Sequence, residues 1–436
     1  MAEINLPITK TGLAYIDNFD EVIPDFLNDF PLYYHPNTGQ FYQFINDTGI
    51  FLLLEENDVR RLIYQYLQDC WNPKLENSML ASLPVYAKVI KEFNDVKDII
   101  VCKNGVFCLD DLQLKKFSSK YHSTFRLEAP YNPDANASTY DKFLKDISCN
   151  DAVLVDTFNE LLGYVLCSSI QAEKLIIMNG FGANGKSTYL NLLTAFVGVD
   201  NVSNISINEI NGKAFSRHFI ADKRLNLIYE GETDMVMSGL MRGAVKQIVT
   251  GDPTSAEIKM GKNYSFIPKL KLIMATNTFP QIDKIPDHAT TRRILILPFN
   301  NHFPAGQADK NMLNKLLAEQ SGILNRAIEG LLRLKQNSWK FSYEANSQQL
   351  LQEMICSEFP VFEFAKERIV ANKAKRLTYS ELRQEFKIWC NKNKLTPILS
   401  DREFAAELKD SLHKLNIPFE LAKGGGDRGL AGITFK

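Results

Sequence analysis

The stretch that most constrains this chain is GFGANGKSTYLNLL, which begins at Gly180. The apolar run LIIMNG leads directly into it, and an apolar-periodic helix follows it. In such a strand–loop–helix segment the glycines let backbone N–H groups wrap phosphate oxygens. A lysine then reaches the β- and γ-phosphates, and the next hydroxyl binds Mg²⁺. The pattern therefore predicts a nucleotide site with ATP and Mg²⁺ as ligands. Its residues are Gly180, Gly182, Asn184, Gly185, Lys186, Ser187 and Thr188.

The segments around this loop alternate between strands and helices, which is typical of a parallel α/β core. LNLIYE, KLKLIMATN and RRILILPF are further expected strands, and STYDKFLKDI is a helix expected to be capped by Ser138. A length of 436 residues leaves room for two or three domains. The expected regions are an N-terminal α+β module over 1–100, a hairpin with a helical pair over 101–170, the α/β core over 171–335 and a winged-helix domain over 345–436.

Two polar clusters at strand ends are candidates for the hydrolytic chemistry. Glu230 and Glu232 follow LNLIY, a strand that we expect beside the P-loop strand. A carboxylate there can hold the Mg²⁺ shell and orient the attacking water. We assign the metal role to Glu230 and a share in activating water to Glu232, and the reverse order stays open, as does a pair of solvated loop acids. Asn277 ends KLKLIMATN, where its amide can hold that water, although Asn is also common in turns.

Arg292 and Arg293 enter the buried strand of the stretch RRILILPF. An arginine at this point can serve as a finger that completes a neighbouring subunit's ATP site by neutralising the transferring phosphoryl group. Either arginine fits that role. The alternative is an ion pair with Asp283 or Asp287 in the same chain. A finger would require the protein to work as a ring.

A lysine-tipped hairpin is expected between the acidic strand and Asn277. The stretch TSAEIKMGKNYSFIPK contains two short β-like runs, with Lys259 and Lys262 at or near the tip. In a ring ATPase such a tip can project into the central channel and grip a phosphodiester backbone. The alternative is a surface hairpin with a solvated tip.

The C-terminal region has the pattern of a winged helix. TYSELRQEFKIWCNKN and SDREFAAELKDSLHKL are capped amphipathic helices, and IPFELAKGGGDRGLAGITFK gives strand, loop, strand, with Lys423 and Arg428 flanking the glycine-rich tip. Charge supports a DNA contact here, because 371–436 holds 13 Lys/Arg against 8 Asp/Glu, whereas 1–100 holds 7 against 15. The alternative is a small helical cap on the α/β core.

Composition places the chain among ordinary globular proteins of a reducing compartment. Its residues are 45% hydrophobic and 23% charged, and its seven cysteines form no CxxC pair. The sequence contains neither an apolar run of about 20 residues nor a signal-peptide pattern. We therefore expect a cytoplasmic protein without a membrane segment.

The segment from about 104 to 300 resembles the superfamily 3 helicase part of phage, plasmid and poxvirus-type primase–helicases. The order and spacing of the shared blocks are far more specific than the P-loop alone. Within this family the chain is most similar to the self-loading replication helicases of staphylococcal genomic islands. The blocks are NGVFCLDD, YNPDANASTYDKFLKDI, ELLGYVL, FGANGKST, TGDPTSAEIKMGKNYSFIPKLKLIMATN and TTRRILILPF.

The resemblance implies a ring-forming, usually hexameric AAA+ ATPase that moves on single-stranded DNA, typically 3′ to 5′. It implies that the pre-sensor-1 hairpin grips DNA, that Asn277 is sensor 1 and that Arg292 or Arg293 is the finger. Larger members carry an upstream primase domain. Residues 1–100 are too few for one and lack paired catalytic carboxylates in a strand context, so a separate primase or polymerase is the expected partner.

These features predict an ATP-dependent replicative DNA helicase, with self-loading at the origin of a mobile genetic element as a further expectation. A GTPase is excluded because the chain lacks the guanine-reading NKxD motif. One alternative is an origin-binding initiator or loader ATPase without processive unwinding. Another is a signalling ATPase whose C-terminal domain binds protein.

Overall fold

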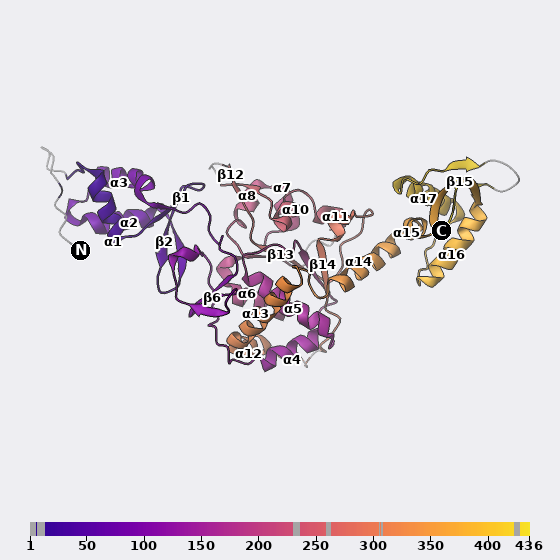
Figure 1. Ribbon diagram of the computed structural model, residues 1–436, viewed down its shortest axis with the longest axis horizontal. Coiled ribbons are helices and arrows are strands. Elements are labelled where there is room, and N and C mark those ends of the chain that lie inside the picture. Colours follow the sequence, from indigo (N-terminus) through magenta and orange to yellow (C-terminus); the bar gives the residue numbers. More distant parts are fainter. Residues whose placement is uncertain are drawn as a thin grey trace. The chain divides into compact units, whose positions relative to one another are not determined.

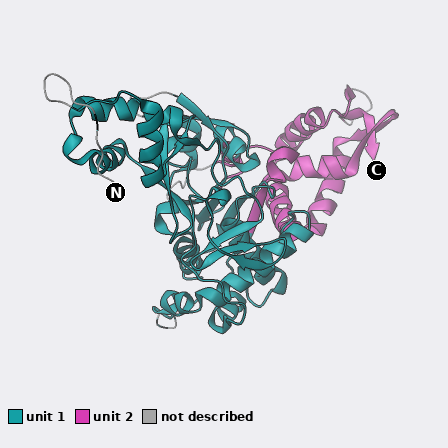
Figure 2. Cartoon of the chain, turned by 60° about the vertical axis from the view of Figure 1, so that its left-hand side comes forward, with its two compact units in different colours: residues 1–233, 241–279, 297–343 teal, residues 234–240, 280–296, 344–436 magenta. Residues whose placement is uncertain are grey.

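The computed structural model of the chain describes residues 6, 14–229, 236–258, 263–304, 306, 308–422 and 428–436. The chain forms two compact units, which Figure 2 colours teal and magenta. Unit 1 comprises 1–233, 241–279 and 297–343, and unit 2 comprises 234–240, 280–296 and 344–436.

Unit 1 begins with a small α+β module, as the sequence predicted. Its four-stranded sheet has the order β3-β2-β1-β4, and the turn between β1 and β2 closes through Gly39, whose φ of 72° favours glycine. Helices α1 to α3 pack on the module around Phe26, Ile63 and Met79, which are fully buried. Its elements are α1 Phe19–Asp29, β1 Tyr33–His35, β2 Gln40–Ile45, β3 Ile50–Leu54, α2 Glu56–Leu67, the 3₁₀ helix Gln68–Cys70, α3 Pro73–Tyr86 and β4 Lys88–Val89.

A three-stranded antiparallel meander and two helices connect this module to the core. The predicted hairpin is confirmed as β5 Ile99–Cys102 and β6 Gly105–Cys108, which β7 Gln113–Lys115 extends. A 3₁₀ helix, Ser119–Tyr121, precedes α4 Ser138–Ile147 and α5 Ala152–Leu166.

The predicted cap of α4 is wrong. Ala137 is the N-cap residue and Ser138 is already helical. The amides of Thr139 and Tyr140 donate instead to the carboxylate of Glu319, at 3.0 and 3.1 Å. A carboxylate supplied by a distant segment satisfies the same unpaired N–H groups as a local hydroxyl and also favours the positive end of the helix dipole.

The core of unit 1 is built on a five-stranded sheet with the order β14-β8-β13-β10-β9. Strands β8, β13, β10 and β9 pair in parallel. Residues Leu175–Met178 and Leu225–Ile228 are all buried, which explains why these strands read as continuous apolar runs. The expectation that the acidic strand lies beside the P-loop strand is wrong, because β13 separates β10 from β8.

Strands and helices of this core alternate along the chain, as the labels of Figure 1 show. The sequence-predicted hairpin before Asn277 forms as an antiparallel pair, β11 with β12. The elements are β8 Leu175–Asn179, α6 Lys186–Val197, the 3₁₀ helix Val199–Asn201, β9 Val202–Ser203, α7 Ile207–Gly212, α8 Ala214–His218, β10 Leu225–Ile228, α10 Gly243–Thr250, β11 Thr254–Glu257, β12 Asn263–Phe266, β13 Lys271–Thr276 and β14 Ile294–Pro298.

Helices α12 Met312–Ala318 and α13 Gln320–Gln336 complete unit 1. Helix α13 packs closely on α5, and glycines permit the close approach. A Cβ at Gly163 would lie 2.2 Å from the Ala327 carbonyl oxygen, and one at Gly330 would lie 2.3 Å from the Asn159 carbonyl carbon. The fully buried carboxylate of Glu160 fastens the pair by accepting from Arg333 Nε at 2.9 Å.

Most of unit 2 is a C-terminal domain with a three-stranded antiparallel sheet of order β15-β17-β16. The predicted caps of α16 and α17 are confirmed, since Thr378 and Ser400 each form a capping box. The sequence did not reveal β15, whose exposed middle has no alternating apolar pattern. The elements are α9 Met237–Leu240, α11 His288–Thr291, α14 Glu344–Glu358, α15 Pro360–Arg368, β15 Ile369–Thr378, α16 Tyr379–Lys392, α17 Asp401–Lys414, β16 Glu420–Ala422 and β17 Gly429–Phe435.

Candidate nucleotide site

The loop between β8 and α6 adopts the backbone that its glycines permit. Gly182 and Gly185 have φ angles of 90° and 88°, in the left-handed region. A Cβ at Gly185 would lie 2.6 Å from Ile147 Cγ2, and one at Gly180 would lie 2.4 Å from the Phe299 carbonyl oxygen. Glycine is therefore required for backbone conformation at Gly182 and Gly185, and for space at Gly180 and Gly185.

Backbone hydrogen bonds hold this loop between β13 and the segment after β14. Gly180 N donates to the Thr276 carbonyl at 3.2 Å, and Phe303 N donates to the Ala183 carbonyl at 2.7 Å. The Asn184 amide donates to the Phe299 carbonyl at 3.2 Å. The loop is thus positioned before any ligand binds, as a phosphate cradle needs to be.

A cavity of about 440 Å³ opens over the loop and the first turn of α6. The free N–H groups and the dipole of this 12-residue helix favour an anion at this end. The residues of the phosphate motif that line the cavity are Gly182, Ala183, Asn184, Gly185, Lys186, Ser187 and Thr188. Seven other lining residues come from distant segments: Phe143, Asp146, Asn277, Phe303, Ala308, Asp309 and Met312.

Lys186 and Asn277 meet in this cavity although 91 residues separate them. Lys186 is buried, and its Nζ donates to the Gly180 carbonyl and to Asn277 Oδ1, the latter at 2.9 Å. Asn277 directly follows β13, the strand next to β8, so the amide reaches the loop from the adjacent strand end. The structure therefore brings together two residues that the sequence analysis selected independently.

One wall of the cavity is apolar, and the sequence analysis missed it. Phe143 lies on α4, Phe303 follows β14 and Met312 begins α12. An aromatic and thioether wall beside a phosphate loop is suited to a nucleobase. The three side chains come from separate segments with no spacing rule, so no motif signal identifies them.

Several predicted site residues lie outside the described part of the chain, namely Glu230, Glu232, Lys259, Lys262 and Lys423. Arg292 is exposed just after α11, whereas Arg293 is buried and donates to the Ala289 carbonyl at 2.9 Å. Both arginines belong to unit 2, while the cavity lies in unit 1. Arg428 is exposed at the start of β17.

The described residues contain no group of three or more His, Cys, Asp or Glu side chains that could hold a metal ion. Ser187 lines the cavity directly after Lys186 and offers the hydroxyl oxygen that Mg²⁺ accepts as a ligand. All seven cysteines are free. Over the same described ranges, no helix has both the length and the apolar character that a membrane span requires.

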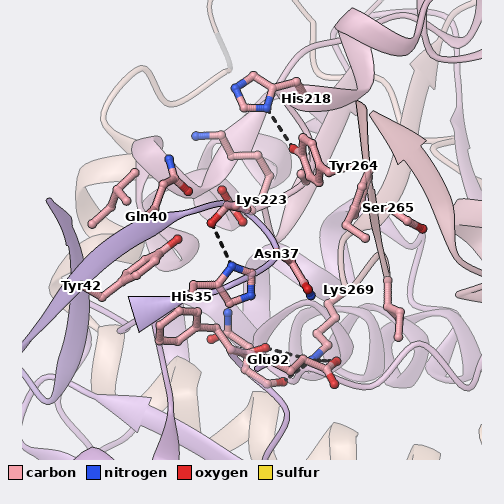
Figure 3. A pocket seen from close by; sticks show the side chains of 18 of the residues that line it. His35, Asn37, Gln40, Tyr42, Glu92, His218, Lys223, Tyr264, Ser265 and Lys269 are labelled. Carbon is pink, nitrogen blue, oxygen red and sulfur yellow. Dashed lines mark hydrogen bonds and ion pairs between the residues drawn. The ribbon is translucent and has the colours of Figure 1, made fainter. Parts of the chain in front are cut away.

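A second, larger cavity of about 620 Å³ shares no lining residue with the first. It lies between the N-terminal module and the base of the β11–β12 hairpin, and Figure 3 shows His35 and Tyr42 facing Tyr264 and Lys269 across it. Lys269 Nζ donates to the carbonyls of Phe93 and Asn94, at 2.9 and 3.0 Å. This lysine therefore ties the linker after β4 to the segment between β12 and β13.

Burial shifts the pKa values of two charged groups in this second cavity. The pKa of Asp222 is raised, first because surrounding protein desolvates the carboxylate and despite the opposing charges of His218, His35 and Lys223. Burial lowers the pKa of His35. His218 Nδ1 and the Tyr264 hydroxyl share a hydrogen bond of 2.9 Å, drawn in Figure 3.

Comparisons with known proteins find two family models that match parts of the chain. Residues 27–149 match a family described as D5 N terminal like, and residues 178–293 match a family of unknown function designated DUF5906. The second match covers the glycine loop after β8, β13 and the double arginine. No curated protein sequence matches the chain.

Solved structures match nearly the whole chain at low sequence identity. An apo structure of the NrS-1 C terminal region is similar with a TM-score of 0.57 and 11% identity, over 95% of this chain and 99% of that one. Two A-form apo structures of the same region each give a TM-score of 0.53 and cover 99% of those chains, with 10% and 9% identity over 94% and 95% of this chain. The likeness shows a shared mixed α/β fold.

Proposed function

We propose that this chain is an ATP-dependent replicative DNA helicase of the primase–helicase type that works as a ring, with a hexamer as the expected assembly. The observation that carries the proposal is the cavity in which Lys186 from the phosphate loop meets Asn277 from the adjacent strand. An amide held beside a P-loop lysine lies where it can sense the γ-phosphate and position a water. The match to the D5 N terminal like family supports the same class.

In this proposal ATP lies with its phosphates on the glycine loop and its base against Phe143, Phe303 and Met312. Mg²⁺ would be held by Ser187 and Glu230, and when bound it neutralises charge on the β- and γ-phosphates. Lys186 exchanges its present acceptors for phosphate oxygens. Glu232 is assigned to the attacking water, as the sequence suggested.

Coupling to a neighbouring subunit is assigned to Arg292. It is the exposed member of the arginine pair, whereas Arg293 is buried. The ion-pair alternative with Asp283 or Asp287 remains open for either arginine. The β11–β12 hairpin, with Lys259 and Lys262 toward its tip, is assigned to the single strand in the channel.

The C-terminal domain is proposed to be a winged helix that binds DNA. Its order α15-β15-α16-α17-β16-β17 places two successive helices before a two-stranded wing, and β15 completes the sheet. This order supports the prediction of a helix-turn-helix with a wing. Recognition of an origin, and with it self-loading on a mobile element, would be its role.

Strand displacement on forked DNA and on closed-circular origin DNA tests the proposal. The wild-type protein should separate strands only with ATP and Mg²⁺, and Lys186→Ala should abolish both hydrolysis and unwinding. Lys262→Ala should lose unwinding while keeping ATPase activity. ATP hydrolysis with no strand separation on either substrate would refute a helicase and leave the initiator or loader as the function. ATPase activity that ignores single-stranded DNA would favour a signalling ATPase.

A further inference from the structure

In a helix-turn-helix the second helix is the one that enters the major groove, which in this domain is α17. Its exposed surface is unsuited to that role. The helix carries four acidic residues, Asp401, Glu403, Glu407 and Asp410, and all four are exposed. The pKa of Glu407 is raised, first by partial burial and then by the negative charges of Glu403 and Asp410.

The basic residues of α17 are fewer than its acidic residues, and one of them is paired with an acid. Lys414 forms an ion pair with Asp410 at 2.6 Å. The helix has three Lys and Arg residues, Arg402, Lys409 and Lys414, one fewer than its acidic residues. Because phosphates dominate the affinity of proteins for DNA, a face with this charge pattern is repelled by a duplex rather than attracted to it.

The cations of α16 and α17 share their helices with acidic residues, whereas β15 carries cations alone. This strand contains Lys373, Lys375 and Arg376, all exposed, and no acidic residue. It forms one edge of the three-stranded sheet in the C-terminal domain (Figure 1). Arg376 is partly compensated, because it helps to lower the pKa of Glu381 after the hydrogen bonds from Thr378. The two lysines are therefore the principal charges of this edge.

A register shift in the sheet coincides with these two lysines. Ala371 pairs with Ile433 and Arg376 pairs with Ala431, so the four residues Asn372–Lys375 stand opposite the single residue Gly432. Such an insertion bends a strand away from its partner. Gly432 has a φ of 87°, which a glycine accommodates without strain.

The end of β15 lies beside Arg428, which follows the glycine-rich tip in the sequence. Thr378 pairs with Gly429, and Tyr379 N donates to the Arg428 carbonyl at 3.0 Å. Arg428 is exposed and lies beside the end of β15, between β16 and β17. We call Lys373, Lys375 and Arg376 the β15 edge.

We propose that the C-terminal domain binds the phosphate backbone of duplex DNA through the β15 edge and not through α17. The proposal rests on the proposed function in taking DNA as the partner, but it does not require that the motor unwinds it. The prediction is quantitative, because each phosphate that the protein neutralises adds about 0.9 to the magnitude of the slope of log K for DNA binding against log salt concentration.

The test compares two double variants of the full-length protein with equal charge loss. Lys373→Gln/Lys375→Gln removes two charges from the β15 edge, and Lys409→Gln/Lys414→Gln removes two from α17. Fluorescence anisotropy with a labelled duplex, without ATP, is measured from 50 to 200 mM NaCl. The first variant should weaken binding at least about tenfold and lower the magnitude of the salt slope by about 2. The second should stay within about twofold of the wild type.

A third variant probes α17 from the opposite direction. Glu407→Gln removes a negative charge, so it should tighten DNA binding only if α17 faces the duplex; we expect no change. Equal losses from the two lysine pairs, a loss confined to the α17 pair, or tighter binding by Glu407→Gln would overturn the assignment. Circular dichroism and basal ATPase activity verify folding of each variant.

Failure of this inference is separable from failure of the helicase proposal. A wild-type protein that binds duplex through the β15 edge but separates no strands refutes the helicase and leaves the surface standing. Efficient unwinding combined with full duplex affinity in the β15 variant refutes the surface and leaves the helicase standing.

Discussion

Lys271 begins β13 deep inside unit 1 and is 2% exposed. Its Nζ donates to the carbonyls of Cys167 and Lys269 and lies 4.8 Å from the centroid of the Tyr164 ring. Burial, together with the nearby charge of Arg224, lowers the pKa of Lys271 from 10.5 to about 8. We predict that replacing it with methionine changes how the stability of unit 1 depends on pH.

The magnitude follows from the two pKa values. A shift from 10.5 to about 8 corresponds to about 3 kcal/mol of differential stabilisation, at about 1.4 kcal/mol per unit. Between these values the unfolded chain binds more protons than the folded one, so the free energy of unfolding rises with pH. The penalty of burying the charge is fully present below about pH 8 and is relieved toward pH 10.5. About 2 kcal/mol of the change falls between about pH 7 and pH 9.5.

Urea unfolding at pH 7.0 and 9.5, followed by circular dichroism, measures this effect in the wild type and in Lys271→Met. The difference between the two proteins isolates the lysine, because the raised pKa values of the buried tyrosines are common to both. Relative to the variant, the wild type should gain about 2 kcal/mol on going to the higher pH. Parallel changes in the two proteins would refute the reasoning, since Lys271 would then titrate as it does in the unfolded chain.

Three further predictions concern the site and its supports. Phe303→Ala should raise the KM for ATP about tenfold with little change in kcat, because the base loses one wall of its cavity. Steady-state ATPase kinetics test this, and Phe181→Ala is the control because the side chain of Phe181 is 97% exposed. Glu319→Ala should destabilise unit 1 by about 1–2 kcal/mol by removing the acceptor of two α4 amides, and an unchanged Tm would contradict it. Lys269→Met should speed chymotrypsin cleavage after Phe93, because the carbonyl of that residue loses its donor; an unaltered cleavage rate would argue against this tie.

The fold was predictable wherever a local rule acts on neighbouring residues. The capping boxes at Thr378 and Ser400 and the turn at Gly39 have local sequence signals, and the structure has all three. The cap of α4 was not predictable, because Glu319 reaches it from 180 residues away. Strand β15 escaped prediction because its exposed middle is polar and its pairing depends on β17.

The phosphate half of the candidate site was predictable, and its surroundings were not. Gly185 and Lys186 belong to a motif whose spacing is fixed by the shape of a phosphate group, so the sequence alone specifies them. The apolar wall of Phe143, Phe303 and Met312 obeys no such rule, because it arises when α4, α12 and the segment after β14 converge.

By itself, the sequence determined the local chemistry of this protein: a glycine loop with left-handed backbone, buried strands, capped helices and the types of residue that end each strand. Only the tertiary structure decided which of these meet. Strand order placed β13 between β8 and β10, and so brought Asn277 to Lys186. The pairing of β15 with β17 placed the lysines on an exposed edge, and the packing of α17 left its acids facing solvent. The physical reason is that spacing along the chain encodes contacts within a turn or a helix, whereas contacts between distant segments depend on how their apolar faces are buried together.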